Sequence, residues 1–296
     1  MCTIFGRGEL AGCKSPFGFL ASTSDDPYGV RTHVIAKSPL HAYRFIGTRI
    51  KSLKNTVPWE GMLTRALNEK GLAFTYSYVP CHEEKGEPRD RLEFSEGLIT
   101  RCSSVAEAAN YLGSGVPEGC TGNWMLLDAS GELAVVEASC SSSEVLMQGD
   151  LVRTNSWQLL STPEKTNVAK TGPDPILTAS SDSRLRRATS LLGLESTVDE
   201  VMNLVRDHEG MSYDEPEYGL SICNHGKSMG TVSAEIVVPR QNALYYNFGR
   251  PCGACDRLAS WGRFHKFVLS EVRDGILTSV EGRILGTTAI ASADLT

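Results

Sequence analysis

Short apolar runs of strand length, separated by turn residues, fill the first eighty positions of the chain. Runs 2–5 and 17–23 flank a glycine-containing connection, and this pattern predicts a hairpin that starts at the N-terminus. A second hairpin is predicted where run 61–67 turns into run 71–79, in which the aromatic residues recur at every second position. The N-terminal part of the chain is therefore expected to form antiparallel β-structure.

The middle of the chain changes from one helix to a series of strands. Ser104 and Glu107 have the spacing of a capping box, and apolar positions at helical spacing follow over residues 105–112. Four apolar runs with short polar breaks then predict an antiparallel meander, over residues 124–128, 133–138, 144–148 and 151–155.

Helices and then strands complete the chain. Helical spacing predicts helices over 183–193 and 197–210, the second capped by Ser196, and strands resume over 231–239 and 243–249. Strands joined by hairpins, with helices between them, indicate an α+β layered architecture. Segments 80–88 and 161–175 have the composition of surface loops and not of linkers, so residues 2–296 are expected to form a single domain.

Composition and charge narrow the class of protein. Hydrophobic residues make up 41% and charged residues 22% of the 296 residues, which is typical of a globular chain with a sizeable core. The net charge of −6 does not indicate a positively charged surface, so neither nucleic acid nor a membrane surface is expected as a partner. No signal peptide or membrane span is recognisable, and nine scattered cysteines fit thiols in a reducing compartment, so a cytoplasmic location is expected.

A cysteine at position 2 is the sharpest chemical feature of the sequence. If Met1 is removed, Cys2 carries both a thiol and a free α-amine, so that nucleophile and base belong to one residue. The alternative is that Cys2 is only a residue of the first strand. A processed N-terminus at Cys13, after Gly12, is also conceivable, but it would discard the first strand of the hairpin.

An ordered set of short segments resembles the N-terminal-nucleophile (Ntn) cysteine hydrolases. The set comprises Cys2, the segment 23–26, the segment 68–72, Arg153-Thr154-Asn155, Ser183-Arg184 and the passage 221–252. The last passage looks closest to the penicillin acyltransferase (isopenicillin N acyltransferase) family, which is related to the choloylglycine hydrolases and penicillin V acylases. The resemblance implies an αββα four-layer sandwich of two antiparallel sheets, with the nucleophile at the open end of the sheet pair.

The resemblance also implies roles for two charged residues. Asp25 corresponds to the carboxylate that accepts a hydrogen bond from the amine of the nucleophile, although a turn residue is the plain alternative. Arg184 corresponds to an arginine near the thiol, where its charge would favour the thiolate. Its neighbours Arg186 and Arg187 leave the assignment open. The bile-salt branch has an arginine where this chain has Ser22, so an arginine from that strand is not expected here.

Two asparagines are candidates for stabilising a tetrahedral oxyanion. Amide cleavage passes through such an anion, which needs preorganised hydrogen-bond donors. The resemblance implies that Asn68 and Asn155 lie at the site. The alternatives are that Asn68 only turns a hairpin and that Asn155 only ends a strand.

Other cysteines and histidines do not form a recognisable motif. Cys252 and Cys255 lack both a thioredoxin-like context and a second pair at zinc-ligand spacing, and are interpreted as loop cysteines. Cys81 and His82 would need distant partners to bind a metal, and His225 is interpreted as a structural histidine. Neither a metal nor a cofactor is therefore predicted.

The function expected from these residues is amide hydrolysis or acyl transfer through an acyl-enzyme on Cys2. The substrate is expected to be a small amide, because a nucleophile between two sheets, edged by loops around 26–44 and 80–95, lies in a pocket. A dipeptidase of the same superfamily is one alternative, and a catalytically silent protein of this fold that binds a small molecule is another. The sequence leaves association into a homo-oligomer open.

Overall fold

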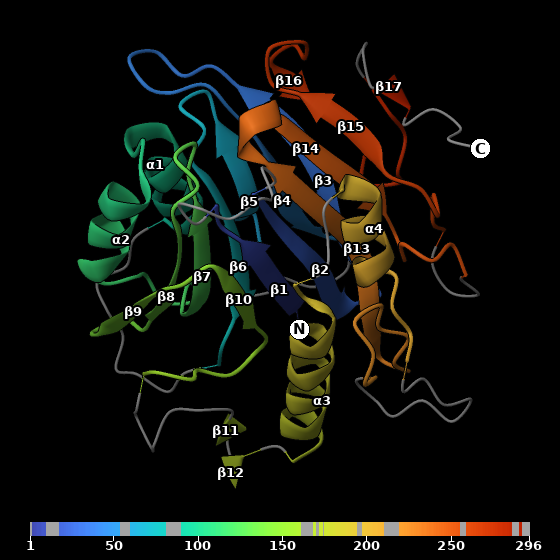
Figure 1. The fold of residues 1–296 in the computed structure, drawn as a ribbon. Coiled ribbons are helices and arrows are strands. Elements are labelled where there is room, and N and C mark those ends of the chain that lie inside the picture. Colours follow the sequence, from blue (N-terminus) through green and yellow to red (C-terminus); the bar gives the residue numbers. More distant parts are fainter. Residues whose placement is uncertain are drawn as a thin grey trace.

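The computed structural model describes two stacked β-sheets with helices on their outer faces (Figure 1). The description covers residues 2–9, 18–53, 60–80, 90–160, 168–169, 172–173, 175–193, 197–209, 219–254, 259–285 and 290–291. The four layers confirm the α+β, αββα architecture predicted from the sequence.

The first sheet contains strands from both the N-terminal and the C-terminal regions of the chain. Within the described residues it has seven strands, in the order β10 (Asp150–Arg153), β1 (Cys2–Arg7), β2 (Phe19–Pro27), β13 (Met229–Val238), β14 (Ala243–Phe248), β15 (His265–Val268) and β17 (Ile290–Ala291). All pairs are antiparallel, and Cys2 lies opposite Ser24 in the β1–β2 hairpin. This hairpin is the one that the first two apolar runs predict.

The second sheet is a longer antiparallel array. Its eight described strands follow the order β16 (Gly275–Ile276), β3 (Val30–Lys37), β4 (Phe45–Ser52), β5 (Leu63–Asn68), β6 (Ala73–Tyr78), β7 (Gly122–Leu127), β8 (Leu133–Ala138) and β9 (Ser143–Met147). The β5–β6 hairpin is confirmed. A separate two-stranded ribbon comprises β11 (Val168–Ala169) and β12 (Gly172–Pro173), and a 3₁₀ turn, η1 (Pro239–Gln241), joins β13 to β14.

Among the residues that the structure describes, two helices cover each sheet. α1 (Arg91–Arg101) and α2 (Val105–Gly113) pack on the second sheet, whereas α3 (Pro175–Leu191) and α4 (Val198–Val205) pack on the first (Figure 1). The Ser104 hydroxyl accepts from the Glu107 amide and caps α2, as predicted. α4 differs in detail, because Thr197 and Glu200 form its capping box and Ser196 lies outside the described residues.

Three apolar clusters hold the layers together. Along β1, Ile4 faces the second sheet and Phe5 faces α3 and α4, because successive side chains of a strand point to opposite faces. A third cluster joins the second sheet to α1 and α2 around the fully buried Trp124. Strands buried on both faces explain why the sequence shows continuous apolar runs.

Two predictions about connectivity are wrong. The run 151–155 is not the fourth strand of the meander, because β10 leaves the second sheet and pairs with β1 at the edge of the first. The segment 26–44 is not a single loop, since β2 extends into it as far as Pro27 and β3 occupies residues 30–37 within the second sheet. Most of the other predicted loop, 80–95, lies outside the described residues, and its last part begins α1.

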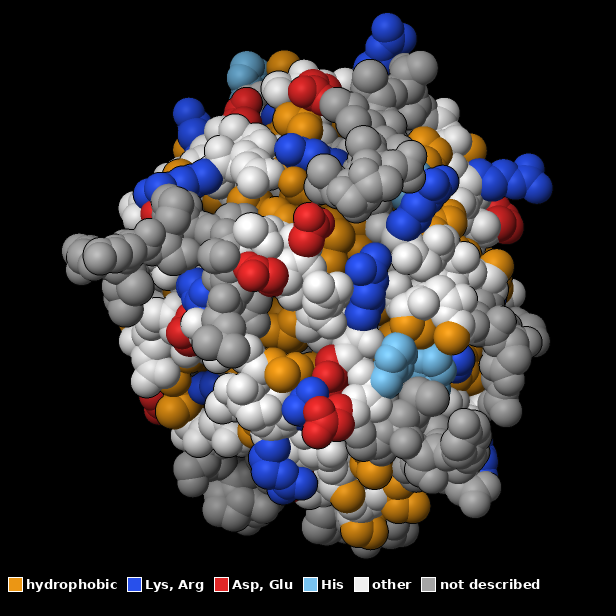
Figure 2. Space-filling view, turned by 45° about the vertical axis from the view of Figure 1, so that its right-hand side comes forward, with side chains coloured by type: hydrophobic (Ala, Val, Ile, Leu, Met, Phe, Trp, Pro, Cys, Tyr) orange, Lys and Arg blue, Asp and Glu red, His pale blue; other side chains and the backbone are white. Residues whose placement is uncertain are grey.

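The described helices are all too short or too polar to cross a membrane. On the face in Figure 2, acidic and basic side chains are interspersed, with hydrophobic patches between them. This face therefore carries no single-sign field that would attract a polyanion.

Candidate active site

Cys2 begins β1, between β10 and β2. Its exposed fraction is 9%. The β1–β10 register, with Ile4 opposite Arg153, places Asn155 opposite Cys2 just beyond the end of β10. The backbone nitrogen of Cys2 donates to Oδ1 of Asn155 at 2.9 Å. Strand pairing thus brings together two predicted site residues that are 153 positions apart.

The amide of Asn155 has a defined orientation. Oδ1 also accepts from Nη2 of Arg184 at 3.1 Å, and Nδ2 donates to the carbonyl oxygen of Tyr78 at 2.7 Å. A guanidinium can only donate and a carbonyl can only accept, so the two neighbours decide which end of the amide is oxygen. The acceptor end of Asn155 therefore faces the nitrogen of Cys2.

Arg184 extends from α3 to the start of β1. The side chain is fully buried, and its Nη1 donates to the carbonyl oxygen of Cys2 at 2.8 Å and to Oγ1 of Thr3 at 3.0 Å. The same nitrogen lies 3.6 Å from Oδ2 of Asp25. Burial lowers the pKa of Arg184, while the Asp25 carboxylate opposes this shift. The structure thus selects Arg184 as the arginine beside Cys2, whereas Arg187 pairs with Asp207.

Asp25 lies in the same buried group, opposite Thr231 of β13. Its Oδ1 accepts from the Thr231 hydroxyl at 2.7 Å, next to a register shift between Thr231 and Ser233. Such bulges redirect side chains near functional sites. Burial raises the pKa of Asp25, and the positive charge of Arg184 opposes the increase. Asp25 is joined to Cys2 through Arg184, and its predicted contact with a free amine stays a prediction.

Arg65 of β5 is a site residue that the sequence analysis missed. This buried side chain crosses from the second sheet, donates to Oγ of Ser22 at 2.8 Å and lies 3.3 Å from Glu235. Arg65 and Cys2 line the same small cavity, so the guanidinium charge acts on the Cys2 thiol. Burial is the largest single influence and disfavours its charge, but Glu235, Cys2 and Asp26 together outweigh it, so the pKa of Arg65 is raised.

A signal for Arg65 was present in the sequence. It is the single charged residue in the apolar run 61–67. The bile-salt branch has an arginine at the place of Ser22, and here an arginine from the opposite sheet hydrogen bonds to that serine. The positive charge that was not expected from β2 is thus supplied by β5.

Cys2 opens into a small cavity between the two sheets. The cavity has a volume of about 20 Å³, and its walls are formed by Cys2, Asp26, Ile50, Thr64, Arg65, Tyr76 and Tyr78. This volume is close to that of one water molecule. Ile50 also lines a larger neighbouring hollow of about 490 Å³, whose wall includes the cationic side chains of Arg49 and Lys51. A substrate larger than water therefore requires the side chains around Cys2 to move apart.

Asn68 is not part of this group, and its contacts do not support the predicted role as an oxyanion donor. It ends β5 at the turn into β6, where Oδ1 accepts from the amides of Lys70 and Leu72. Its Nδ2 donates to the carbonyl oxygens of Ile99 and Cys102. Both amide protons and both lone pairs are thereby used, so Asn68 fixes the hairpin and the end of α1, which was its plain alternative.

Comparison with known proteins agrees with this arrangement. The family model described as "Acyl-coenzyme A:6-aminopenicillanic acid acyl-transferase" matches residues 26–243, about three quarters of the chain. The chain belongs to this family. A search of curated proteins finds no match to this chain.

Solved structures of Ntn hydrolases share the fold of this acyl-transferase family member. A mutant of the conjugated bile acid hydrolase from Clostridium perfringens has a TM-score of 0.56 at 15% identity, covering 98% of this chain and all of the other. Penicillin V acylase from Agrobacterium tumefaciens has a TM-score of 0.52 at 15% identity, covering 96% and 100% of the two chains. At this identity the likeness concerns the Ntn fold alone, and the family itself comprises acyltransferases and amidohydrolases.

Proposed function

We propose that this protein cleaves or transfers the acyl group of small amides, with Cys2 as an N-terminal nucleophile after removal of Met1. The observation that carries the proposal is the hydrogen bond from the Cys2 nitrogen to Oδ1 of Asn155. That contact holds the nitrogen beside its own thiol, inside a group that also contains Arg184 and Asp25. A free amine at this place can serve as the base for the thiol.

The proposed reaction runs through a thioester. The thiol proton passes to the α-amine, the sulfur attacks the acyl carbon, and a tetrahedral oxyanion forms. The amine returns the proton to the leaving nitrogen, the carbon–nitrogen bond breaks, and the acyl group stays on the Cys2 sulfur. Water or an acceptor amine then attacks the thioester and restores the thiol.

Three neighbours have distinct proposed roles in this reaction. Asn155 orients the Cys2 nitrogen through Oδ1, and its second N–H is a candidate donor to the oxyanion. Arg184 holds the carbonyl of Cys2 and fixes the first residue of β1. Arg65, from the opposite sheet, lines the cavity of Cys2 and supplies a positive charge where negative charge develops.

The surroundings of Cys2 support a compact substrate. The cavity at Cys2 lies between the sheets and is enclosed by side chains, which suits a small molecule and not a polypeptide chain.

Asp26 favours a second candidate function, that of a dipeptidase. Its side chain is 3% exposed and lines the same cavity as Cys2. A carboxylate at this place can bind the free amine of a dipeptide, although the nearby Arg65 offsets part of its charge.

A substrate screen separates the two candidates. The protein is incubated with a panel of N-acyl amines, N-acyl amino acids and dipeptides, and the released amine is quantified. Amide hydrolysis predicts turnover of the acylated compounds that disappears in Cys2→Ala and persists in Asp26→Asn. A dipeptidase predicts turnover of dipeptides whose KM rises strongly in Asp26→Asn. Absence of turnover with every class, with or without an acceptor amine, would contradict both.

A further inference from the structure

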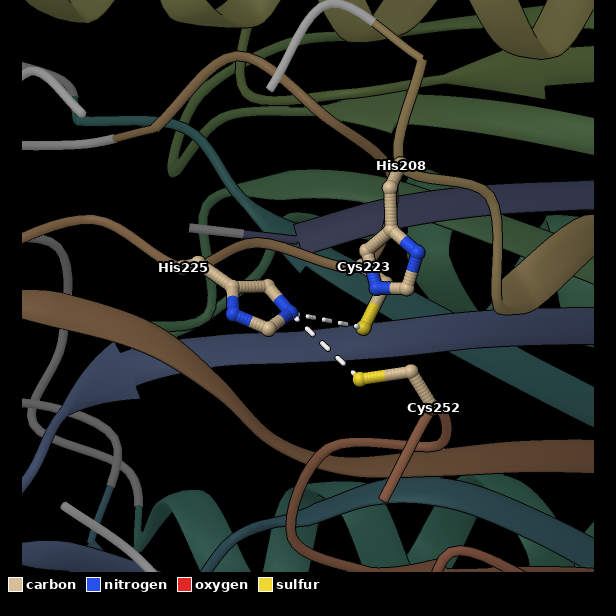
Figure 3. A group of neighbouring side chains, drawn as sticks. All are labelled: His208, Cys223, His225 and Cys252. Atoms are coloured by element: carbon tan, nitrogen blue, oxygen red, sulfur yellow. Dashed lines mark hydrogen bonds between the residues drawn. The ribbon is translucent and has the colours of Figure 1, made fainter. Parts of the chain in front are cut away.

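Two histidines and two cysteines meet near the start of β13, away from the cavity of Cys2 (Figure 3). His208 follows α4, Cys223 and His225 precede β13, and Cys252 follows β14. The four possible ligand atoms all lie within 4.8 Å of one another. Figure 3 shows the two imidazoles and the two thiols converging on one point, with Cys223 and His225 on the same segment and His208 and Cys252 on two others.

The distances match the edges of a tetrahedral zinc site. Sγ of Cys223 lies 3.6 Å and Sγ of Cys252 lies 3.4 Å from Nε2 of His225. With Zn–S of about 2.3 Å and Zn–N of about 2.0 Å, tetrahedral geometry places sulfur and nitrogen about 3.5 Å apart. An N–H···S hydrogen bond has a similar length, so a single contact would not decide. The convergence of four such ligands, with no carboxylate among them, points to a metal.

We propose that His208, Cys223, His225 and Cys252 bind one zinc ion. Two thiolates and two imidazoles are the ligand set that tetrahedral zinc prefers, and hard cations such as Ca²⁺ or Mg²⁺ do not use it. Four protein ligands complete the tetrahedron and leave no position for substrate or water. The zinc ion is therefore structural and takes no part in the reaction at Cys2.

Arg250 shapes the chemistry of this site. Its Nη1 lies 2.9 Å from Nδ1 of His225, and because a guanidinium only donates, Nδ1 is the acceptor. In the neutral ring the proton then resides on Nε2, between the two sulfurs. When Nε2 binds zinc, the neutral ring carries its proton on Nδ1 instead, so the contact between Arg250 and Nδ1 opens, while the charge of Arg250 still offsets the negative charge of the ligands. Binding releases protons, so the affinity for zinc falls as the pH falls.

The zinc site holds the loop that supports Asp25. Asn224, between two ligands, donates through its backbone nitrogen to Oγ1 of Thr231 at 2.8 Å. That hydroxyl donates in turn to Oδ1 of Asp25 at 2.7 Å. Cys223 is also fixed by its own backbone nitrogen, which donates to the carbonyl oxygen of Asp207 at 3.0 Å. The ion thus joins the ends of α4, β14 and the segment before β13.

Metal analysis of the purified full-length protein tests the proposal. The protein is expressed with zinc, dialysed under reducing conditions and analysed by inductively coupled plasma mass spectrometry. We expect one zinc per chain in the wild type and in Cys140→Ser, a matched control at another half-buried cysteine. Cys252→Ser and His208→Gln should lose the zinc, because each removes one of the four ligands.

Two further measurements keep the test independent of folding and of the proposed reaction. Titration of the metal-free wild type with Co²⁺ should produce the absorption of tetrahedral cobalt with thiolate ligands. Cys2→Ala should retain its zinc, because the proposed nucleophile is not a ligand. The proposal is overturned if the wild type neither carries nor takes up zinc or cobalt, if Cys223 and Cys252 are joined as a disulfide in the fresh protein, or if Cys2→Ala loses the metal.

Discussion

Cys2 lies on one side of Asp25, and Cys223 and Cys252 lie on the other. The surroundings of these cysteines differ in kind. Cys2 is contacted by an amide and by guanidinium groups, and its thiol borders a cavity. Cys223 and Cys252 face imidazole nitrogen, and the four possible ligand atoms lie within 4.8 Å of one another. A thiol that borders a cavity next to positive charge suits a nucleophile, whereas four soft ligands around one point suit a metal. Cysteine sulfur therefore acts as the nucleophile in the proposed reaction at Cys2 and as a metal ligand in the proposed zinc site.

The two groups are connected by short hydrogen bonds. Thr231 accepts from the backbone of Asn224 and donates to Asp25, which lies 3.6 Å from Arg184. A change in the metal cluster should therefore alter the stability of the active-site end, without removing the nucleophile itself. The following predictions separate these two effects.

Removing each thiol should produce opposite phenotypes. In Cys2→Ala we expect kcat to fall by about 10⁴-fold or more with the melting temperature nearly unchanged, because the nucleophile is lost from a strand end. In Cys252→Ala we expect a marked loss of melting temperature, because zinc no longer stabilises the fold. Steady-state kinetics and calorimetry on both variants check this. Equal loss of turnover with equal loss of stability in the two variants would remove the distinction.

Arg65 should matter for stability as well as for the reaction. Arg65→Met leaves Glu235 as an uncompensated buried charge, which is expected to cost about 3–5 kcal/mol in the free energy of unfolding. The double variant Arg65→Met/Glu235→Leu should regain most of this stability but not the turnover. Urea unfolding and kinetics of the two variants provide the measurement. Full recovery of turnover in the double variant would show that Arg65 acts only as a partner of Glu235.

The two predicted asparagines should now behave differently. Asn155→Ala should lower kcat about 10²-fold, the typical effect of removing one oxyanion donor. Asn155→Asp retains the acceptor that holds the Cys2 nitrogen, so any activity it keeps above Asn155→Ala measures orientation alone. Asn68→Ala should instead reduce stability by about 1–3 kcal/mol, because buried groups lose their partners. A kcat effect of Asn68→Ala without loss of stability would contradict its structural role.

The smallest expected effect is on the stability of the protein at acidic pH. Burial, with help from Arg49 and Lys51, lowers the pKa of His33 to about 4 from the usual 6.5. The folded state therefore binds fewer protons than the unfolded state, so stability falls as the pH decreases from about 6.5 towards 4. His33→Gln should flatten the melting temperature over this window, leaving a slope from other groups. An unchanged slope in His33→Gln would show that His33 does not titrate in this way.

Local signals in the sequence were sufficient for the layers but not for the site. Hairpins and helix caps depend on neighbouring residues, so β1–β2, β5–β6 and α2 were predictable. Asn68 and Asn155 look alike in the sequence, since each follows an apolar run. Only pairing between β1 and β10 shows that Asn155 lies at Cys2.

Long-range contacts also explain what was missed. Arg65 acts across two sheets, and its partners Ser22 and Glu235 belong to β2 and β13. The four ligands of the cluster come from segments that share no fixed spacing, so Cys252 and His225 were interpreted as a loop cysteine and a structural histidine. The sequence contains no motif that links the four residues. They come together only because the ends of α4, β13 and β14 lie side by side in the fold.

The central claim is that the acyl group is carried by an N-terminal Cys2. The most direct test is rapid acid quenching during turnover of a substrate found in the screen, followed by intact-mass and peptide mass spectrometry. If Cys2 is the nucleophile, the quenched chain lacks Met1 and carries the acyl mass on the peptide that begins with Cys2. Full activity of a chain that retains Met1, or an acyl group on any other residue, would contradict it.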